Sequence, residues 1–134
     1  MKVRFADSYF YIAVLDTEDQ HHQRVRTATD GRDDFHVTTR WVLAEVADAF
    51  SAPAMRSLAG PFLKDLETDP GTMIMEPSDE LYQRGMTLWQ QRPDKAWSLT
   101  DCISFAVMEA RGLAEALTGD RHFAQAGFVA VFAD

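Results

Sequence analysis

Four acidic residues occupy positions from which their carboxylates could meet in one place. Asp7 directly follows an apolar segment that is typical of a strand, and Asp120 follows another such segment after a single glycine. In an open parallel sheet the carboxyl ends of the strands border one crevice, so acids at two strand ends converge despite a large separation in sequence. Glu45 and Asp101 lie on predicted helices that lead into the same sheet. The four residues therefore predict a cluster of carboxylate oxygens.

The two acids on helices are expected to border apolar surface. Glu45 has Trp41 and Ala49 one turn away, which would flank its carboxylate with apolar groups. Asp101 closes a Ser-x-x-Asp sequence, the spacing of a capping box, and the positive end of the helix dipole favours a carboxylate there. Taken singly, each acid also has an ordinary role: Asp101 as a helix cap, Glu45 as a solvated helix residue, and the strand-end acids as turn residues.

Four carboxylates in one cluster would repel one another in the absence of a cation, so the joint pattern predicts a bound metal ion. Oxygen ligands suit Mg2+ or Mn2+, hard cations that are held by a few carboxylates together with water and substrate phosphate. Phosphoryl chemistry is the natural use of such a site.

The elements that must position these acids predict an α/β fold, because short apolar runs alternate with helical patterns. Strands are predicted over residues 3–6, 35–38, 72–75, 114–118 and 128–132. Helices are predicted directly after Asp7, over 20–29, 40–51, 54–67, 78–91 and 98–111, and briefly after Asp120. No repeat or linker divides the sequence, so we expect a single domain over residues 1–134.

Composition limits the kinds of protein that the chain can be. Acidic residues outnumber basic ones 21 to 13, which argues against a protein that coats nucleic acid with a broad basic face. The single cysteine, Cys102, cannot form an intramolecular disulfide, and one cysteine is too few for a structural zinc site. A reducing, cytoplasmic location is therefore expected. Arg4 and Asp7 interrupt the apolar start, so neither a secretion signal nor a membrane partner is expected.

Four segments carry a resemblance to a known family. They are "KVRFADS", "TTRWVLAEV", "DKAWSLTDCISFAVMEARG" and "ALTGDRHFAQAGF", of which the last two are the most specific. Together they span nearly the whole chain and resemble the PIN-domain family, in particular its small single-domain VapC-type ribonucleases. The resemblance implies a short parallel β-sheet of about five strands flanked by helices. It also implies a metal-dependent endoribonuclease that hydrolyses RNA phosphodiester bonds, with catalytic metal ligands at Asp7, Glu45, Asp101 and Asp120.

The resemblance implies further roles around these acids. Ser8, Thr100 and Thr118 stand where polar residues would support the ligands, and Arg121 and His122 follow Asp120 closely enough to meet phosphate. Arg40, Arg92 and Lys95 could line an RNA path, although solvated surface is the ordinary position for such residues. The implied partners are an RNA substrate, a cognate antitoxin and a second copy of the chain in a homodimer.

Other chemistry is less well supported by the remaining residues. The histidines lack the spacing of a zinc-binding helix, so surface positions are expected for His21, His22, His36 and His122. Cys102 lies in an apolar helix without an evident histidine partner, so an inert core thiol is expected. Met86, Trp89 and Trp97 occur at helical spacing, which is typical of core residues.

Two alternative functions stay open. One is a nonenzymatic RNA-binding or protein-binding module built on the same fold, against which the presence of all four acids speaks. The other is a nuclease for RNA maturation or for DNA that is not a toxin. A short upstream gene for a DNA-binding protein would favour the toxin interpretation.

Overall fold

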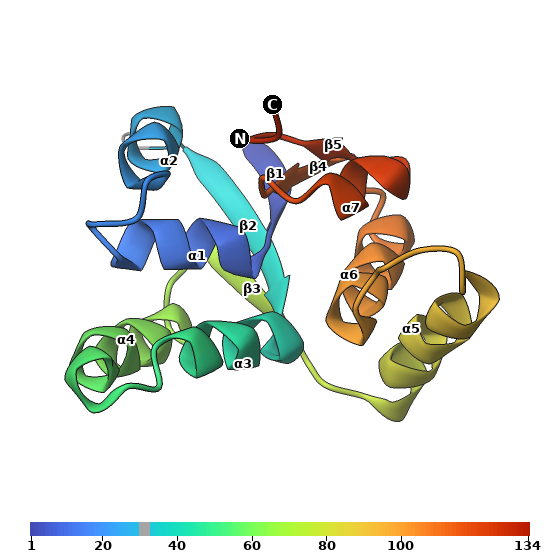
Figure 1. Ribbon diagram of the computed structural model, residues 1–134, viewed down its shortest axis with the longest axis horizontal. Coiled ribbons are helices and arrows are strands. Elements are labelled where there is room, and N and C mark those ends of the chain that lie inside the picture. The colour runs from blue at the N-terminus through green and yellow to red at the C-terminus, as the bar shows by residue number, and fades with distance from the viewer. Residues whose placement is uncertain (30–32) are drawn as a thin grey trace.

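The computed structural model describes residues 1–29 and 33–134 and contains a parallel β-sheet between helices (Figure 1). The strands are β1 (Lys2–Ala6), β2 (Asp34–Thr39), β3 (Thr72–Met75), β4 (Glu115–Leu117) and β5 (Val129–Ala130). The helices are α1 (Ser8–Leu15), α2 (His22–Thr29), α3 (Arg40–Ala49), α4 (Pro53–Leu66), α5 (Asp79–Gln91), α6 (Leu99–Ala110) and α7 (Arg121–Gln125). The predicted strands and helices are confirmed, with ends shifted by a few residues.

The order of the strands creates a place for a ligand. The sheet runs β3-β2-β1-β4-β5, and every neighbouring pair is parallel. The chain therefore builds outward from β1 to β3 and then crosses to the other side of β1 for β4 and β5. Figure 1 shows α1, α2, α3 and α4 on one side of the sheet and α5, α6 and α7 on the other. The crevice between the carboxyl ends of β1 and β4 is a topological switch point, where ligands bind in open α/β sheets.

Helix α6 is the most deeply buried helix, as its nearly continuous apolar sequence predicts. Every residue from Asp101 to Met108 is buried, and Cys102 is a core residue as expected. Helix α5 approaches α6 closely at Gly85, where an added Cβ would come within 2.3 Å of Ile103 Cγ1. This packing fixes the N-terminal half of α6, which carries Asp101, against α5.

The prediction that Met86, Trp89 and Trp97 are core residues is wrong for Trp89. Trp97 is buried and Met86 is half-buried, but Trp89 is 48% exposed. The buried residues of α5 are Leu81 and Gly85, and Leu88 also packs against the core, whereas Trp89 does not. Helical spacing alone did not identify Trp89 as an exposed residue. No helix among the described residues is long and apolar enough to cross a lipid bilayer.

Candidate metal centre

The Asp7 carboxylate is hydrogen bonded to a residue at the end of the neighbouring strand β4 and does not cap its own helix. Asp7 stands at the N-cap position of α1, yet its side chain makes no capping hydrogen bond. Instead, the Thr118 hydroxyl, at the end of β4, donates a 2.8 Å hydrogen bond to Asp7 Oδ2. Asp7 is only 5% exposed. The carboxylate is therefore fixed at the boundary between β1 and β4, which is the switch point of the sheet.

Asp7 lies in an environment that disfavours its charge. Burial raises the pKa of Asp7 to about 7, against the opposing effect of hydrogen bonds from Thr118 and from the backbone of Ser8. The charges of Asp101 and Glu45 raise this pKa further. Burial and like charge thus act in the same direction, and a bound cation would relieve both.

Asp101 and Asp120 begin two helices and turn their carboxylates toward each other. Asp101 forms the predicted capping box: Ser98 N donates to Asp101 Oδ2 at 3.1 Å, and Asp101 N donates to Ser98 Oγ at 3.0 Å. Asp120 caps α7, since Oδ1 accepts a 2.9 Å bond from His122 N. The ordinary capping role and a ligand role are therefore compatible for Asp101, because each carboxylate has further lone pairs.

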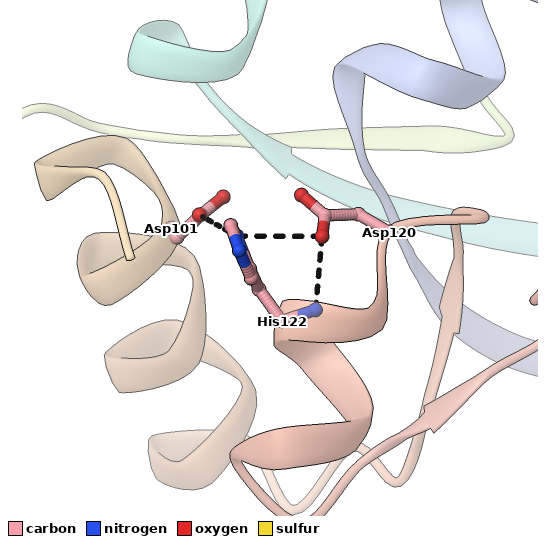
Figure 2. Close-up of side chains that lie close together, drawn as sticks. All are labelled: Asp101, Asp120 and His122. Carbon is pink, nitrogen blue, oxygen red and sulfur yellow. Dashed lines mark hydrogen bonds and ion pairs between the residues drawn. The ribbon is translucent and has the colours of Figure 1, made fainter. Parts of the chain in front are cut away.

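The ring of His122 lies between these two carboxylates, as Figure 2 shows. His122 Nδ1 is 3.1 Å from Asp101 Oδ2 and 3.3 Å from Asp120 Oδ1. One ligand atom from each of the three residues lies within 4.8 Å of the others. Burial raises the pKa of Asp101, with Ser98 and His122 opposing that rise and the charge of Asp120 adding to it.

Glu45 on α3 completes the acidic group from the opposite side. It is half-buried, and burial raises its pKa while a hydrogen bond with the Ser8 side chain lowers it. The charges of Asp101 and Asp120 raise its pKa, so Glu45 belongs to the same electrostatic cluster. The expected apolar flank is incomplete, because Ala49 is exposed. Trp41, the other expected flanking residue, is half-buried and packs against the core.

Of the other residues predicted around the acids, some are hydrogen bonded to them and some lie elsewhere. The Ser8 side chain is hydrogen bonded to Glu45, and the Thr118 hydroxyl is hydrogen bonded to Asp7. Thr100 instead contributes its backbone carbonyl to the Ser104 hydroxyl, and its side chain makes no hydrogen bond to the acids among the described residues. Arg121 is exposed in the first turn of α7. Two of the basic residues considered for an RNA path, Arg40 and Arg92, form exposed ion pairs with Glu67 and Asp94.

The expectation of surface positions is wrong for all four histidines, since His21, His22, His36 and His122 are each half-buried. His122, also considered for contact with phosphate, lies beside the carboxylates of Asp101 and Asp120, and His36 on β2 has its ring 5.1 Å from that of Phe10. The Asp-x-His spacing at a helix start was the available signal for His122, because the first turn brings the third residue back toward the N-cap. His36 carried no such signal, since its burial depends on which helix covers β2.

Two contacts that sequence reasoning missed hold α7 in place. The Trp97 indole donates a 3.0 Å hydrogen bond to Gln125 Oε1, which ties α7 to the segment before α6. Gly119, directly before Asp120, packs against Tyr9, where an added Cβ would lie 2.7 Å from the ring. A glycine is therefore required for the close approach of β4 and α1 beside Asp120.

Comparison with known proteins supports the same architecture. No family model and no curated protein matches the chain. Among solved structures it is similar to Mycobacterium tuberculosis VapC20, a sarcin-ricin loop cleaving toxin, with a TM-score of 0.88 and 22% sequence identity. The match covers 97% of this chain and 98% of that chain. The chain therefore shares the fold of VapC20. The α/β fold predicted from the resemblance, a short parallel sheet flanked by helices, is thereby confirmed.

The donor set also fits a divalent cation. Carboxylate oxygens from Asp101 and Asp120 and the imidazole nitrogen of His122 are close enough to share one ion. Asp7 and Glu45 add negative charge that is not balanced by the bonds of Thr118 and Ser8. Hard divalent ions take such oxygen-rich sets.

Proposed function

We propose that the chain is a metal-dependent endoribonuclease that hydrolyses phosphodiester bonds of RNA. Asp7, Glu45, Asp101 and Asp120 are its metal ligands and catalytic residues, with Mg2+ or Mn2+ as the ion. The observation that carries the proposal is the convergence of these carboxylates at the switch point of the sheet, where burial and mutual repulsion raise the pKa of Asp7, Glu45 and Asp101. Similarity to VapC20, a toxin that cleaves the sarcin-ricin loop, supports RNA as the substrate.

When bound, the ion supplies an activated water and neutralises charge that develops on the phosphate oxygens. The chain's own contribution is to hold the ligands in position before substrate arrives. Thr118 donates to Asp7, the Ser98 backbone donates to Asp101, and the His122 backbone donates to Asp120. Ligands that are already oriented by a donor lose less freedom when an ion binds, which favours a rigid and reactive site.

The biological setting is part of the proposal. We propose a toxin that acts on RNA in the cytoplasm, is blocked by a cognate antitoxin and forms a homodimer. The resemblance to VapC-type ribonucleases and the fold of VapC20 support this setting. Co-expression with the product of an adjacent short reading frame should restore the growth of cells that are arrested by this chain. Growth arrest that no adjacent gene product relieves would favour the RNA-maturation alternative.

The test of the activity uses purified protein and two RNA substrates, an unstructured single strand and a stem-loop with the sarcin-ricin sequence. Cleavage is expected with Mg2+ or Mn2+ and should stop in excess EDTA, because the ion provides the nucleophile. Asp7→Asn is the inactive control. Cleavage that persists in EDTA would contradict the proposal. Folded protein that binds the ion and RNA without cleaving either substrate would favour the nonenzymatic alternative.

A further inference from the structure

His122 lies where a ligand of an ion would lie. Its Nδ1 atom is 3.1 Å from Asp101 Oδ2 and 3.3 Å from Asp120 Oδ1. Around an octahedral ion with bonds of about 2.1 Å, neighbouring ligand atoms are separated by about 3.0 Å. The two measured separations match that spacing, and one ligand atom from each of the three residues lies within 4.8 Å of the others.

We propose that His122 Nδ1 is a direct ligand of the divalent ion, together with Asp101 and Asp120, and that this nitrogen makes the site prefer Mn2+ over Mg2+. The inference rests on the proposed function, since it names the ion that the proposed nuclease uses. It adds a nitrogen ligand to a site whose other proposed ligands are all carboxylates.

The local construction of α7 keeps this nitrogen in place. The side chain of His122 is 30% exposed, and the next residue, Phe123, is fully buried against Phe5 and Phe105. The backbone of His122 is fixed in addition by its hydrogen bond to Asp120 Oδ1. With its backbone fixed by the buried Phe123 and by Asp120, His122 loses less conformational freedom when its ring serves as a ligand.

The partners of Nδ1 also favour a cation. An ionised carboxylate only accepts hydrogen bonds, and Nδ1 faces two carboxylate oxygens, one from Asp101 and one from Asp120. Nδ1 is hydrogen bonded to Asp101 Oδ2, and the one hydrogen that it carries in a neutral imidazole cannot also point along a good direction at Asp120 Oδ1. A metal ion bound among the three atoms interacts favourably with all of them at once.

A nitrogen ligand strengthens the binding of some divalent ions more than that of others. Mg2+ is a hard cation that prefers oxygen and retains several waters, whereas imidazole nitrogen suits transition metals. A site made from carboxylates alone would discriminate little between Mg2+ and Mn2+. With His122 as a ligand, removal of the imidazole should weaken the binding of Mn2+ more than that of Mg2+.

The first experiment needs no substitution. The full chain is produced with 15N-labelled histidine, loaded with Mn2+ and compared with unlabelled protein by pulsed electron paramagnetic resonance. A nitrogen coupling to Mn2+ that changes on labelling is expected, since it requires an imidazole nitrogen bound to the ion. His122→Ala should abolish the coupling, whereas the matched control His21→Ala should retain it.

Calorimetry measures the consequence for affinity. His122→Ala should weaken the binding of Mn2+ by at least about tenfold and that of Mg2+ by clearly less, while His21→Ala changes neither. Mn2+ bound without a histidine coupling in the parent protein would overturn this inference and leave the proposed nuclease standing. Equal losses for the two ions in a folded His122→Ala variant would overturn it as well. A parent protein that binds neither ion would instead overturn the proposed function itself.

Discussion

Two groups of buried charge lie along β1, and they are built in opposite ways. Toward the start of the strand, Arg4 forms an ion pair with Asp34 on β2, and the two side chains are 7% and 10% exposed. Beyond the end of the strand, Asp7 is equally buried but faces Asp101 and Glu45, which carry the same sign of charge. The first group is neutral within the protein. The second group lacks that compensation, which supports our proposal that its acids bind a cation, whereas the Arg4–Asp34 pair carries its own counter-charge.

The largest expected effect is on stability and comes from breaking the ion pair between Arg4 and Asp34. Asp34→Ala should lower the free energy of unfolding by about 3–5 kcal/mol, because it leaves the Arg4 guanidinium buried without its partner. Urea unfolding measures the loss. The double variant Arg4→Met with Asp34→Leu should recover most of it, since the buried charge is then absent altogether. A loss below about 1 kcal/mol in Asp34→Ala would show that the pair is not a stabilising unit.

The second effect concerns activity and should fall on the acidic group alone. Asp7→Asn should slow RNA cleavage by about a hundredfold or more, because a ligand and its negative charge are lost while the shape is kept. Asp34→Ala, assayed at a temperature where it is folded, should cleave within a few-fold of the parent protein. Equal losses in the two variants would remove the distinction between the two groups.

The third effect is on stability in the absence of the ion, and its sign is opposite to that of the first. The pKa of Asp7 is raised from its usual value to about 7, so the folded state disfavours its ionised form. Its favourable contribution is present at acid pH and is lost as the pH rises through about 7. In EDTA at pH 8, Asp7→Asn should therefore melt above the parent protein by roughly 3 °C or more.

The pH dependence and the ion both sharpen this test. The advantage of Asp7→Asn should shrink as the pH falls toward 4, where Asp7 is protonated in the parent protein as well. It should also shrink on addition of Mn2+, because the parent protein binds the ion more tightly and is stabilised by mass action. Melting curves with and without Mn2+ are sufficient. A variant that melts lower than the parent protein at every pH would indicate that Asp7 is not under electrostatic strain.

The smallest effect is expected at Cys102, beside Asp101 in the sequence but outside the acidic group. Burial raises the pKa of the Cys102 thiol to about 11, so it remains protonated and is no nucleophile. Cys102→Ser should therefore cleave RNA within about threefold of the parent protein, as long as it is folded. A loss as large as that of Asp7→Asn in a folded Cys102→Ser protein would require a role for the thiol in the reaction.

Local interactions of this protein could be predicted from its sequence. The capping box of Ser98 and Asp101 depends on residues three apart, and the burial of α6 follows from an apolar run of one helical length. The strand-end positions of Asp7 and Asp120 follow from the apolar segments before them. These features arise within one element or at its ends, where spacing and residue type determine the conformation.

The contacts that make the site specific depend on which elements become neighbours. Asp7 meets Thr118, 111 residues away, because β4 lies beside β1 in the sheet. His122 meets Asp101 because α7 packs beside α6, and Arg4 is compensated by Asp34 because β2 lies on the other side of β1. No periodicity in the sequence specifies the order β3-β2-β1-β4-β5, since every strand offers the same backbone hydrogen bonds to any neighbour. The sequence by itself therefore determined which acids stand at element ends, whereas only the tertiary structure decided which of them are paired, which repel one another, and that a histidine lies among them.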